Sequence, residues 1–588
     1  MGIPGLMSQV KRSRSCHKQV DIAREAEKVR SEGREPVVIV DMMACLRIMY
    51  GSLPWVPGGQ TKEFVCEVEK FADRFKRVGI KLVFYIDGSL DEAKEEKWKK
   101  NKKSKIDIVQ NIFDNMRRRS CGIGVGHIEV LPQNLGFTAV RALRRCGCEV
   151  IRSVGDCDLE IARYGCDEKC LAVLASDSDF IIFPGNWQFW ALDDLCLDKM
   201  TTMAFDKSQF ALNLGIDVRH FPILASLLGN DVIERHHLST FHRAYKMAKN
   251  FPEATLVASF IRGAVAKSSE PDLEFVARKA FLTGRAKELF FKSVQSYDVE
   301  TSVRDDPPSD DENWNAVCRM MRKRHIEGNP LEIYGSAVKG LYTYPHSLEE
   351  YRQRDEKPLP PNQQVTLTLR RKIYGILLFE KPPKGGEHYV RELVVTGPES
   401  LNRSFTPVSA IMPKTPHPGL RELWSASETY VGQRWALLCE PMGIDPDILH
   451  QSNVPPRLYA LTLALKYLID EKVDFQPQEL AAIASSAVMV EHYSAQQIAD
   501  MEVDLYPRPV QLATIVYQTC RLILTLNAAC GYPINEDEAD PVNFQDGKLF
   551  QRAFNKLMAR PSKVEELCEK EKRWIKQCNA ILDVLSAY

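Results

Sequence analysis

Two pairs of aspartates, each with its members two residues apart, have a spacing that could serve chemistry. Asp156 and Asp158 open a helix-length segment, and the apolar run Leu171–Ala175 is followed by Asp177 and Asp179. Carboxylate oxygens are hard ligands that suit magnesium or manganese. A strand that ends just before Asp177 places this pair at the sheet edge where open α/β folds keep their sites. One Asp-x-Asp pair alone is usually a turn, so the prediction depends on the two pairs together.

The same pattern of an apolar strand, a terminal aspartate and a helix occurs at two earlier places. Val37–Val40 ends in Asp41, and Lys81–Ile86 ends in Asp87. Alternating strands and helices predict an α/β fold with a three-layer, mostly parallel sheet. Because parallel strands end at one edge, we expect these carboxylates to lie near those of the two pairs.

Length, charge and hydropathy limit the classes of protein. The 588 residues are enough for two to four domains with a sizeable core, and 44% of them are hydrophobic and 27% charged. With 78 basic and 78 acidic residues there is no overall field that attracts nucleic acid or an anionic membrane. Phosphate binding would therefore need a local patch.

Targeting and redox signals favour a protein of the nucleus or cytoplasm. The segment Met1–Val20 is too polar and basic for a secretory signal, and Leu512–Gly531 is interrupted by polar residues, so we expect no membrane span. The 16 cysteines include no Cys-x-x-Cys pair. We interpret them as reduced thiols.

A dense basic run between Lys94 and Lys105 is the candidate local patch. Its basic residues are Lys94, Lys97, Lys99, Lys100, Lys102, Lys103 and Lys105. Three interpretations stay open: a solvated helix face, a phosphate-binding patch beside the acidic residues, and a nuclear-localisation signal.

One short apolar segment has two possible interpretations. Leu224-x-x-Leu227-Leu228 fits the pattern with which short helices dock into nuclear-receptor grooves. Three leucines on one helix face are more often core, and we favour that interpretation.

Composition shifts predict four regions. We expect an α/β domain over 1–300, a linker region over 301–362, a small β-containing region over 363–450 and a helical C-terminal domain over 451–588. The alternation that begins at Val365 and runs to Phe379, together with His388–Val395, predicts a β-hairpin or meander. The C-terminal helices are expected over 457–471, 477–490, 509–531, 546–558 and 562–587.

The collected carboxylates form a candidate metal site. They are Asp41, Asp87, Asp156, Asp158, Asp177, Asp179 and Asp231. Cleavage of a phosphodiester commonly uses two divalent ions roughly 3.5–4 Å apart, held by carboxylates from several elements. Without metal, so many charges close together would raise each other's pKa values.

The order of these segments resembles the flap endonuclease superfamily, whose catalytic domain is PIN-like; residues 1–300 are similar to the related asteroid proteins as well. The matching segments are Met1-Gly-Ile-x-Gly-Leu6, Val40-Asp41-x-x-x-Cys45-Leu46, Asp87-Gly88, Asp156-Cys-Asp158-Leu-Glu-Ile-Ala162, Ser176-Asp177-Ser-Asp179 and Leu227-Leu228-Gly229-x-Asp231.

That resemblance implies two Mg²⁺ or Mn²⁺ ions held by the seven aspartates. It implies catalytic roles for Lys94, Asp41, Asp87, Asp158 and Asp177. It also implies nucleic-acid binding by Lys94, Lys97, Lys100, Lys102 and Lys103. Three departures weaken flap recognition: Asp156 is shorter than the family's glutamate, Asn101 stands where the family has an arginine, and the Gly-rich hairpin after Asp231 is missing.

A second resemblance covers nearly the whole chain: it is similar to the constitutive coactivators of peroxisome proliferator-activated receptor gamma. The matching segments are Cys45-Leu46-Arg47, Trp55-x-x-Gly58-Gly59-Gln60, Gly79-Ile80-Lys81-Leu82-x-Phe84, Leu228-Gly229-Asn230-Asp231, Tyr506-x-x-Pro509-x-Gln511-Leu512, Ala529-Cys530-Gly531-Tyr532-Pro533 and Asp546-Gly547-Lys548-Leu549-Phe550. It implies a nuclear protein that binds a nuclear receptor or another transcription partner through its C-terminal region.

Three functions therefore stay open. The first is a transcriptional coactivator or interaction scaffold that keeps the PIN-like domain as structure. The second is a Mg²⁺- or Mn²⁺-dependent, structure-selective endonuclease on DNA or RNA. The third is a protein that binds nucleic acid without cutting it.

Overall fold

The computed structural model describes residues 2–90, 94–118, 135–245, 253–265, 272–300, 309–328, 332–345, 347–351, 358–383, 385–559 and 563–587. The chain forms two compact units. Unit 1 contains Met1–Ile48, Lys70–Gly88 and Leu143–Asp305, and unit 2 contains Met49–Glu69, Ser89–Ala142 and Asp306–Tyr588. Segments 49–69 and 89–142, which we assigned to the N-terminal domain, therefore belong to unit 2.

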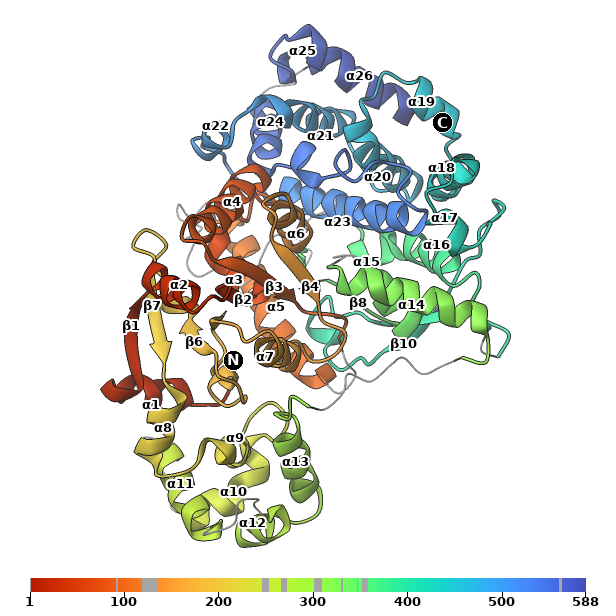
Figure 1. Cartoon of the computed structure of the whole chain (residues 1–588). Helices are drawn as coiled ribbons and strands as arrows, with labels where there is room; N and C mark the ends of the chain where they lie inside the picture. Colours follow the sequence, from red (N-terminus) through yellow and green to blue (C-terminus); the bar gives the residue numbers. More distant parts are fainter. Residues whose placement is uncertain are drawn as a thin grey trace. The chain divides into compact units, whose positions relative to one another are not determined.

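Unit 1 is built on a seven-stranded sheet with the order β1-β7-β6-β5-β2-β3-β4 (Figure 1). Strands β2 to β6 are parallel, whereas β7 pairs antiparallel with β6 and β1 antiparallel with β7. The strands are β1 (His17–Asp21), β2 (Val37–Asp41), β3 (Lys81–Ile86), β4 (Glu149–Arg152), β5 (Ala172–Ala175), β6 (Gln188–Ala191) and β7 (Thr201–Phe205). The predicted α/β fold with a mostly parallel sheet is confirmed, and the three predicted strands are the neighbours β5, β2 and β3.

One face of the sheet is covered by α7 (Cys157–Asp167). Ile39 of β2 lies in register with Val83 of β3 and Val173 of β5, so the three side chains share a face. They pack in one buried cluster with Ile161 of α7. The β-branched residues of these strands therefore form the centre of the unit 1 core.

The other face is covered by the part of α4 (Thr61–Arg77) that belongs to unit 1. Phe71 of α4 lies 6.3 Å from Phe84 of β3 and 5.2 Å from Phe75, measured between ring centroids, and all three rings are buried. Helices on both faces of the sheet give the three layers that the sequence predicts.

The remaining helices of the first 300 residues include a helical group from α9 to α13 (Figure 1). They are α1 (Leu6–Arg12), α2 (Ile22–Ser31), α3 (Met42–Tyr50), α8 (Lys207–Leu214), α9 (Phe221–Leu228), α10 (Ser239–Ala244), α11 (Glu253–Ala264), α12 (Leu273–Lys279) and α13 (Gly284–Gln295). In α9, Leu224, Leu227 and Leu228 are at most 2% exposed. They are core residues, which confirms the favoured interpretation, and they are not accessible for receptor docking.

Unit 2 contains a three-stranded sheet with the order β10-β9-β8. Its strands are β8 (Leu341–Thr343), β9 (Tyr389–Leu393) and β10 (Thr406–Ser409). The strand predicted within His388–Val395 is β9. The strand predicted from Val365 to Phe379 is wrong, because that stretch forms α15 (Asn362–Val365) and α16 (Leu367–Leu377).

The rest of unit 2 is helical, as predicted for the C-terminal region. Its helices include α5 (Glu95–Arg117), α14 (Glu312–Ile326), α17 (Leu420–Leu423), α18 (Val431–Cys439), α19 (Pro446–Gln451), α20 (Tyr459–Asp470), α21 (Pro477–Met489), α22 (Ala495–Ala499), α23 (Pro507–Ala529), α24 (Gly547–Ala559), α25 (Val564–Leu567) and α26 (Lys572–Ser586). The last predicted helix is thus two helices, and the expected linker region contains α14 and β8. α6 (Leu135–Arg145) crosses the boundary between the units. Among the described helices, none is both long and apolar enough to cross a bilayer.

Candidate functional site

Three aspartates mark the carboxyl ends of neighbouring parallel strands in unit 1. Asp41 is the last residue of β2, Asp87 directly follows β3, and Asp177 stands two residues after β5. The Asp41 Oδ1 atom accepts a hydrogen bond of 3.2 Å from the Ala44 backbone N–H at the start of α3. Burial raises the pKa of Asp41 to about 6, and the charges of Asp87 and Asp177 act in the same direction. The predicted edge therefore does bring these three carboxylates together.

The start of α7 adds two more carboxylates to this edge. Asp156 caps the helix and accepts hydrogen bonds from the backbone N–H groups of Asp158 at 3.1 Å and Leu159 at 3.4 Å. Burial raises the pKa of Asp158 well above the usual range, and the charges of Asp156, Asp177, Asp41 and Asp179 raise it further. Its ionised form is therefore disfavoured both by burial and by four acidic neighbours.

Asp179 belongs to a buried hydrogen-bond network. The Tyr297 hydroxyl donates to Asp179 Oδ1 at 3.0 Å and accepts a hydrogen bond of 3.0 Å from Asn230 Nδ2. Asn230 also donates to Ser293 Oγ at 2.8 Å. Asp231, the seventh predicted ligand, is exposed, and its neighbour Asn230 is the residue that connects this loop to Asp179.

The sequence prediction missed Asn230 and Tyr297. Asn230 lies in the Gly229-Asn230-Asp231 segment, directly before the predicted ligand Asp231. Nothing in the sequence near Tyr297 indicates its role, because its partner lies 118 residues earlier in the chain.

The first residues of the chain lie against this acidic edge. The Ile3 backbone N–H donates to Ser178 Oγ at 2.9 Å. Gly2 has φ +94°, and a Cβ atom on it would lie 2.0 Å from Asp177 Oδ1. Gly2 is therefore needed both for its left-handed backbone and for its close approach to Asp177.

The carboxylates at this edge are the predicted ligands of a two-metal centre, which stays a prediction. Their chemistry suits a hard cation. Within the described residues, however, no three His, Cys, Asp or Glu side chains are grouped so that they could hold a metal ion. Asp41, Asp156 and Asp177 instead accept hydrogen bonds from backbone N–H groups. Burial and the neighbouring carboxylates raise the pKa values of Asp41 and Asp158, as expected for acidic groups that lie close together without a cation between them.

Lys102 is not part of a nucleic-acid surface, and this prediction is wrong. The side chain lies inside unit 2, where the residue is 4% exposed and its Nζ atom donates to the Tyr344 carbonyl oxygen at 3.2 Å. The ammonium group lies 5.0 Å from the centroid of the Trp98 ring. Burial lowers the pKa of Lys102 to about 7, so the residue carries only part of its charge at neutral pH.

The other lysines of the run lie on α5 or immediately before it. Lys94, Lys100 and Lys103 are exposed, and Lys97 is half-buried. Lys99, in contrast, is buried and forms ion pairs with Glu95 at 2.6 Å and with Glu96 at 2.9 Å. The run therefore has an exposed side that carries basic residues and a side that packs into unit 2.

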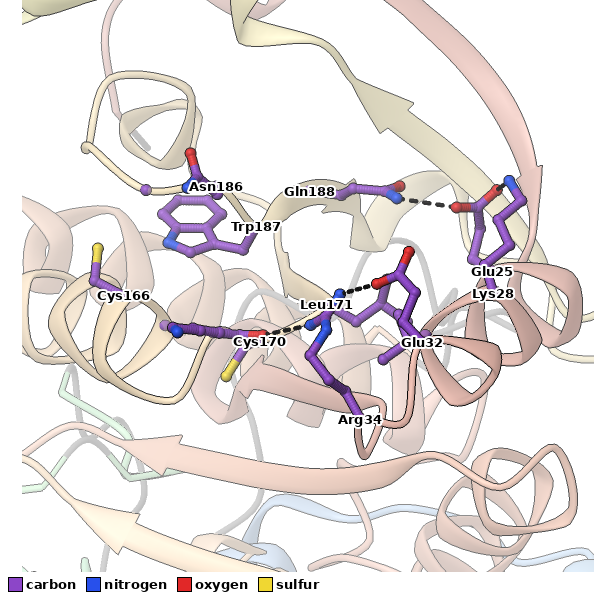
Figure 2. A pocket seen from close by; sticks show the side chains of 14 residues that line it. Glu25, Lys28, Glu32, Arg34, Cys166, Cys170, Leu171, Asn186, Trp187 and Gln188 are labelled. Atoms are coloured by element: carbon purple, nitrogen blue, oxygen red, sulfur yellow. Dashed lines mark hydrogen bonds and ion pairs between the residues drawn. The ribbon is translucent and has the colours of Figure 1, made fainter.

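A cavity of about 500 Å³ lies at the opposite edge of the unit 1 sheet, where β5 and β6 begin (Figure 2). Figure 2 shows two ion pairs in its lining, Arg34 with Glu32 and Lys28 with Glu25, each at 2.6 Å. Gln188 Nε2 also donates a hydrogen bond to Glu25 at 3.0 Å. Trp187 lines the cavity with an indole ring that Lys207 Nζ approaches to 3.5 Å from the centroid.

Comparison with known proteins gives one family of relatives. A model of the FAM120A-like domain matches residues 214–301, the region of α9 to α13. The constitutive coactivator of peroxisome proliferator-activated receptor gamma from Bos taurus is 26% identical over 647 residues, which covers 94% of this chain and 91% of that protein. The constitutive coactivator of PPAR-gamma-like protein 1 homolog from Xenopus tropicalis is 26% identical over 284 residues, or 43% of this chain and 26% of that protein.

The solved structures that match include proteins in complex with DNA. The catalytic core of Rad2 in complex with a DNA substrate matches with a TM-score of 0.30 and 17% identity, and covers 52% of this chain and 84% of that chain. Human GEN1 in complex with Holliday junction DNA matches with a TM-score of 0.31 and 12% identity, and covers 61% of this chain and 82% of that chain. The fold assignment itself rests on the sheet order described above.

Proposed function

We propose that this chain, which belongs to the family of the constitutive coactivators of peroxisome proliferator-activated receptor gamma, acts as a nuclear interaction scaffold in transcription. The observation that carries this proposal is the extent of the similarity. It covers 94% of the chain, and so includes the sheet of unit 1 and the helices of unit 2. The names of these relatives describe them as coactivators of peroxisome proliferator-activated receptor gamma.

The geometry of the acidic edge supports a scaffold better than an enzyme. Asp41 and Asp156 accept hydrogen bonds from backbone N–H groups at the starts of α3 and α7, and so contribute to the local fold. Lys99 and Lys102, the inner residues of the basic run, are held by contacts inside unit 2. Both features stabilise the fold.

Exposed apolar side chains in the C-terminal part of unit 2 are candidates for partner contact. Val431 of α18 is 42% exposed and Ile448 of α19 is 37% exposed. Trp435, one turn after Val431, contacts His450 of α19 with the ring centroids 4.5 Å apart. Large apolar and aromatic residues are typical of the centres of protein interfaces.

We expect the double variant Val431→Asp, Ile448→Asp to bind the ligand-binding domain of peroxisome proliferator-activated receptor gamma at least about tenfold more weakly than the wild type. Charged groups in an apolar contact lose hydration without gaining a partner. Affinity is measured with the full chain by calorimetry or biolayer interferometry. Point variants are preferable to truncation, because unit 2 is made of three separate segments.

The matched control is Leu212→Asp, which alters an apolar side chain of unit 1 that is 72% exposed. It should bind the receptor domain as the wild type does. Binding that is lost in Leu212→Asp and kept in the double variant would contradict the assignment to unit 2. Absence of binding by the wild type would contradict the choice of partner.

A metal-dependent nuclease, or a protein that binds nucleic acid without cutting it, is the second candidate. The observation that favours it is the gathering of Asp41, Asp87, Asp156, Asp158, Asp177 and Asp179 within interaction range at one sheet edge. The exposed lysines Lys94, Lys100 and Lys103 would contact phosphates in this case.

Under the scaffold proposal, we expect purified protein to cut flapped or single-stranded DNA or RNA no faster than Asp177→Ala does, in Mg²⁺ or in Mn²⁺. Cleavage by the wild type that is absent in Asp177→Ala and kept in Asp193→Ala, an exposed carboxylate of the same unit, would establish the nuclease instead. Salt-sensitive binding without cleavage, lost in Lys100→Glu, Lys103→Glu, would establish the non-cutting binder.

A further inference from the structure

Two segments of unit 2 that are far apart in the sequence meet at a buried contact. The Gly547 backbone N–H donates to the Gly59 carbonyl oxygen at 2.8 Å, and Gln551 Nε2 donates to the Pro57 carbonyl oxygen at 3.3 Å. A Cβ atom on Gly547 would lie 2.6 Å from the carbonyl group of Pro57. The approach is therefore too close for any residue other than glycine at 547.

Two buried carboxyl groups lie at this contact, one from each segment. Glu63, in the first turn of α4, is 5% exposed, and Asp546, directly before α24, is 1% exposed. Both Oε atoms of Glu63 and the Oδ2 atom of Asp546 are buried without a hydrogen-bond partner among the described residues. The Asp546 Oδ1 atom accepts a 2.9 Å hydrogen bond from the Leu549 backbone N–H.

The charged and titratable groups around the pair come from several elements. They are Tyr50 of α3, Lys62 of α4, Tyr517 of α23 and Lys548 of α24, with Glu491 and Arg457 next to Lys62. The two ammonium groups are directed elsewhere: Lys62 Nζ donates to the Tyr493 carbonyl oxygen at 2.7 Å, and Lys548 Nζ donates to the Ala499 carbonyl oxygen at 2.6 Å. Neither ammonium group therefore donates a hydrogen bond to a carboxylate of the pair.

We propose that Glu63 and Asp546 share a proton at neutral pH and that this proton holds the Pro57–Glu63 segment against the start of α24. Two ionised carboxylates, three of whose oxygens have no hydrogen-bond partner among the described residues, would repel each other in a buried place. Loss of the shared proton therefore opens the contact locally. The fold thus contains a pH-sensitive closure between its Gly58-Gly59-Gln60 and Asp546-Gly547-Lys548 segments.

The direction of the pKa shifts gives the pH range. Burial raises the pKa of Glu63 to about 7 and raises that of Asp546 well above its usual range. A carboxyl group with a raised pKa in the closed state binds more protons there than in the open state. Closure is therefore most favourable below the ordinary glutamate pKa and weakens as the pH rises toward about 7.

The hydrogen bond from Gly547 to Gly59 gives a local reporter for the test. Hydrogen exchange of the full chain is followed by mass spectrometry in peptides that contain Gly547, and the rates are corrected for intrinsic exchange. In the wild type, we expect protection to fall by up to about tenfold for each pH unit between roughly pH 5 and 7. In Glu63→Gln, which leaves Asp546 as the one titrating carboxyl group of the pair, we expect protection to fall less steeply with pH than in the wild type.

Three further variants and an added divalent cation complete the test. Asp546→Asn should also weaken the pH dependence, and the double variant Glu63→Gln, Asp546→Asn should remove it. Glu502→Gln, which changes an exposed glutamate of unit 2, should keep the dependence of the wild type. Equal pH dependence in the wild type and Glu63→Gln would overturn the proposal. Protection that rises when calcium or magnesium chloride is added would overturn it as well, because the carboxylates would then bind a cation instead of a proton.

Discussion

Asp158→Asn is expected to raise the free energy of unfolding by about 1–3 kcal/mol near pH 7.5. In the wild type, the carboxyl group loses solvent and faces the charges of Asp156, Asp177, Asp41 and Asp179. Asparagine keeps the size of the side chain and removes the charge. The variant should therefore be more stable, although the residue lies at the centre of the acidic edge.

The size of this stability difference depends on pH in a defined way. Asp158 has a raised pKa in the folded state, so its stabilising proton is fully present below the pKa of the unfolded chain and is lost as the pH rises. The difference between Asp158→Asn and the wild type should vanish near pH 4 and grow toward neutral pH. Asp41, whose pKa is about 6, adds to the same trend in the wild type.

Urea unfolding of both proteins at several pH values measures this difference. Asp167→Asn, which alters an exposed residue at the end of the same helix, should change stability by less than about 0.5 kcal/mol. An Asp158→Asn variant that is less stable than the wild type at neutral pH would contradict the prediction. It would show that the carboxylate is needed in its ionised form, as in a metal site.

The strands of unit 1 and the edge where its aspartates meet could be predicted from the sequence. Val37–Val40 and Lys81–Ile86 are short apolar runs rich in β-branched residues, and each ends at an aspartate. Parallel strands end at one edge, so the meeting of Asp41, Asp87 and Asp177 follows from topology alone. The prediction needed no knowledge of distant contacts.

The function of the edge could not be predicted in the same way, because coordination depends on side-chain direction. Asp156 and Asp177 cap short helical segments and accept backbone hydrogen bonds. Spacing alone does not distinguish a cap from a metal ligand, since aspartate is a favoured residue for both. The network of Asp179, Asn230 and Tyr297 depends on a tyrosine that lies far away in the sequence.

The predictions for Lys102 in the basic run and for the strand from Val365 to Phe379 were wrong for two different reasons. Lys102 follows Trp98 by one helical turn, and its burial depends on the distant Tyr344, so no local pattern reveals it. The α16 segment did carry a signal. Leu369, Ile373 and Leu377 repeat every four residues, which indicates a helix, but the alternation at its start was given more weight.

The boundaries of the units could not be obtained from composition. Unit 2 includes residues 49–69 and 89–142 from the first part of the chain. Its contacts, such as that of Gly547 with Gly59, join residues that are almost 500 positions apart in the sequence. A composition change marks linkers that are exposed and polar. It does not detect a segment that leaves one compact unit, packs in another and returns.

Glu392→Ala is expected to lower the free energy of unfolding by about 3–5 kcal/mol, the largest loss among the variants considered. Glu392 is 2% exposed and Arg370 of α16 is 1% exposed, and the two form hydrogen bonds of 2.8 and 2.9 Å. The Tyr374 hydroxyl also donates to Glu392 at 2.7 Å. Removal of the carboxylate leaves a buried guanidinium ion without its charge partner, in the contact that joins α16 to β9.

A second variant separates the loss of the pair from the presence of an unpaired charge. In Arg370→Met, Glu392→Met both charges are absent, and apolar packing should restore most of the stability lost in Glu392→Ala, because desolvation of the ions is no longer required. Glu387→Ala, an exposed glutamate just before β9, should change the urea midpoint little. If the double variant is as unstable as Glu392→Ala, the hydrogen bonds of the pair, and not the cost of an uncompensated charge, hold α16 against β9.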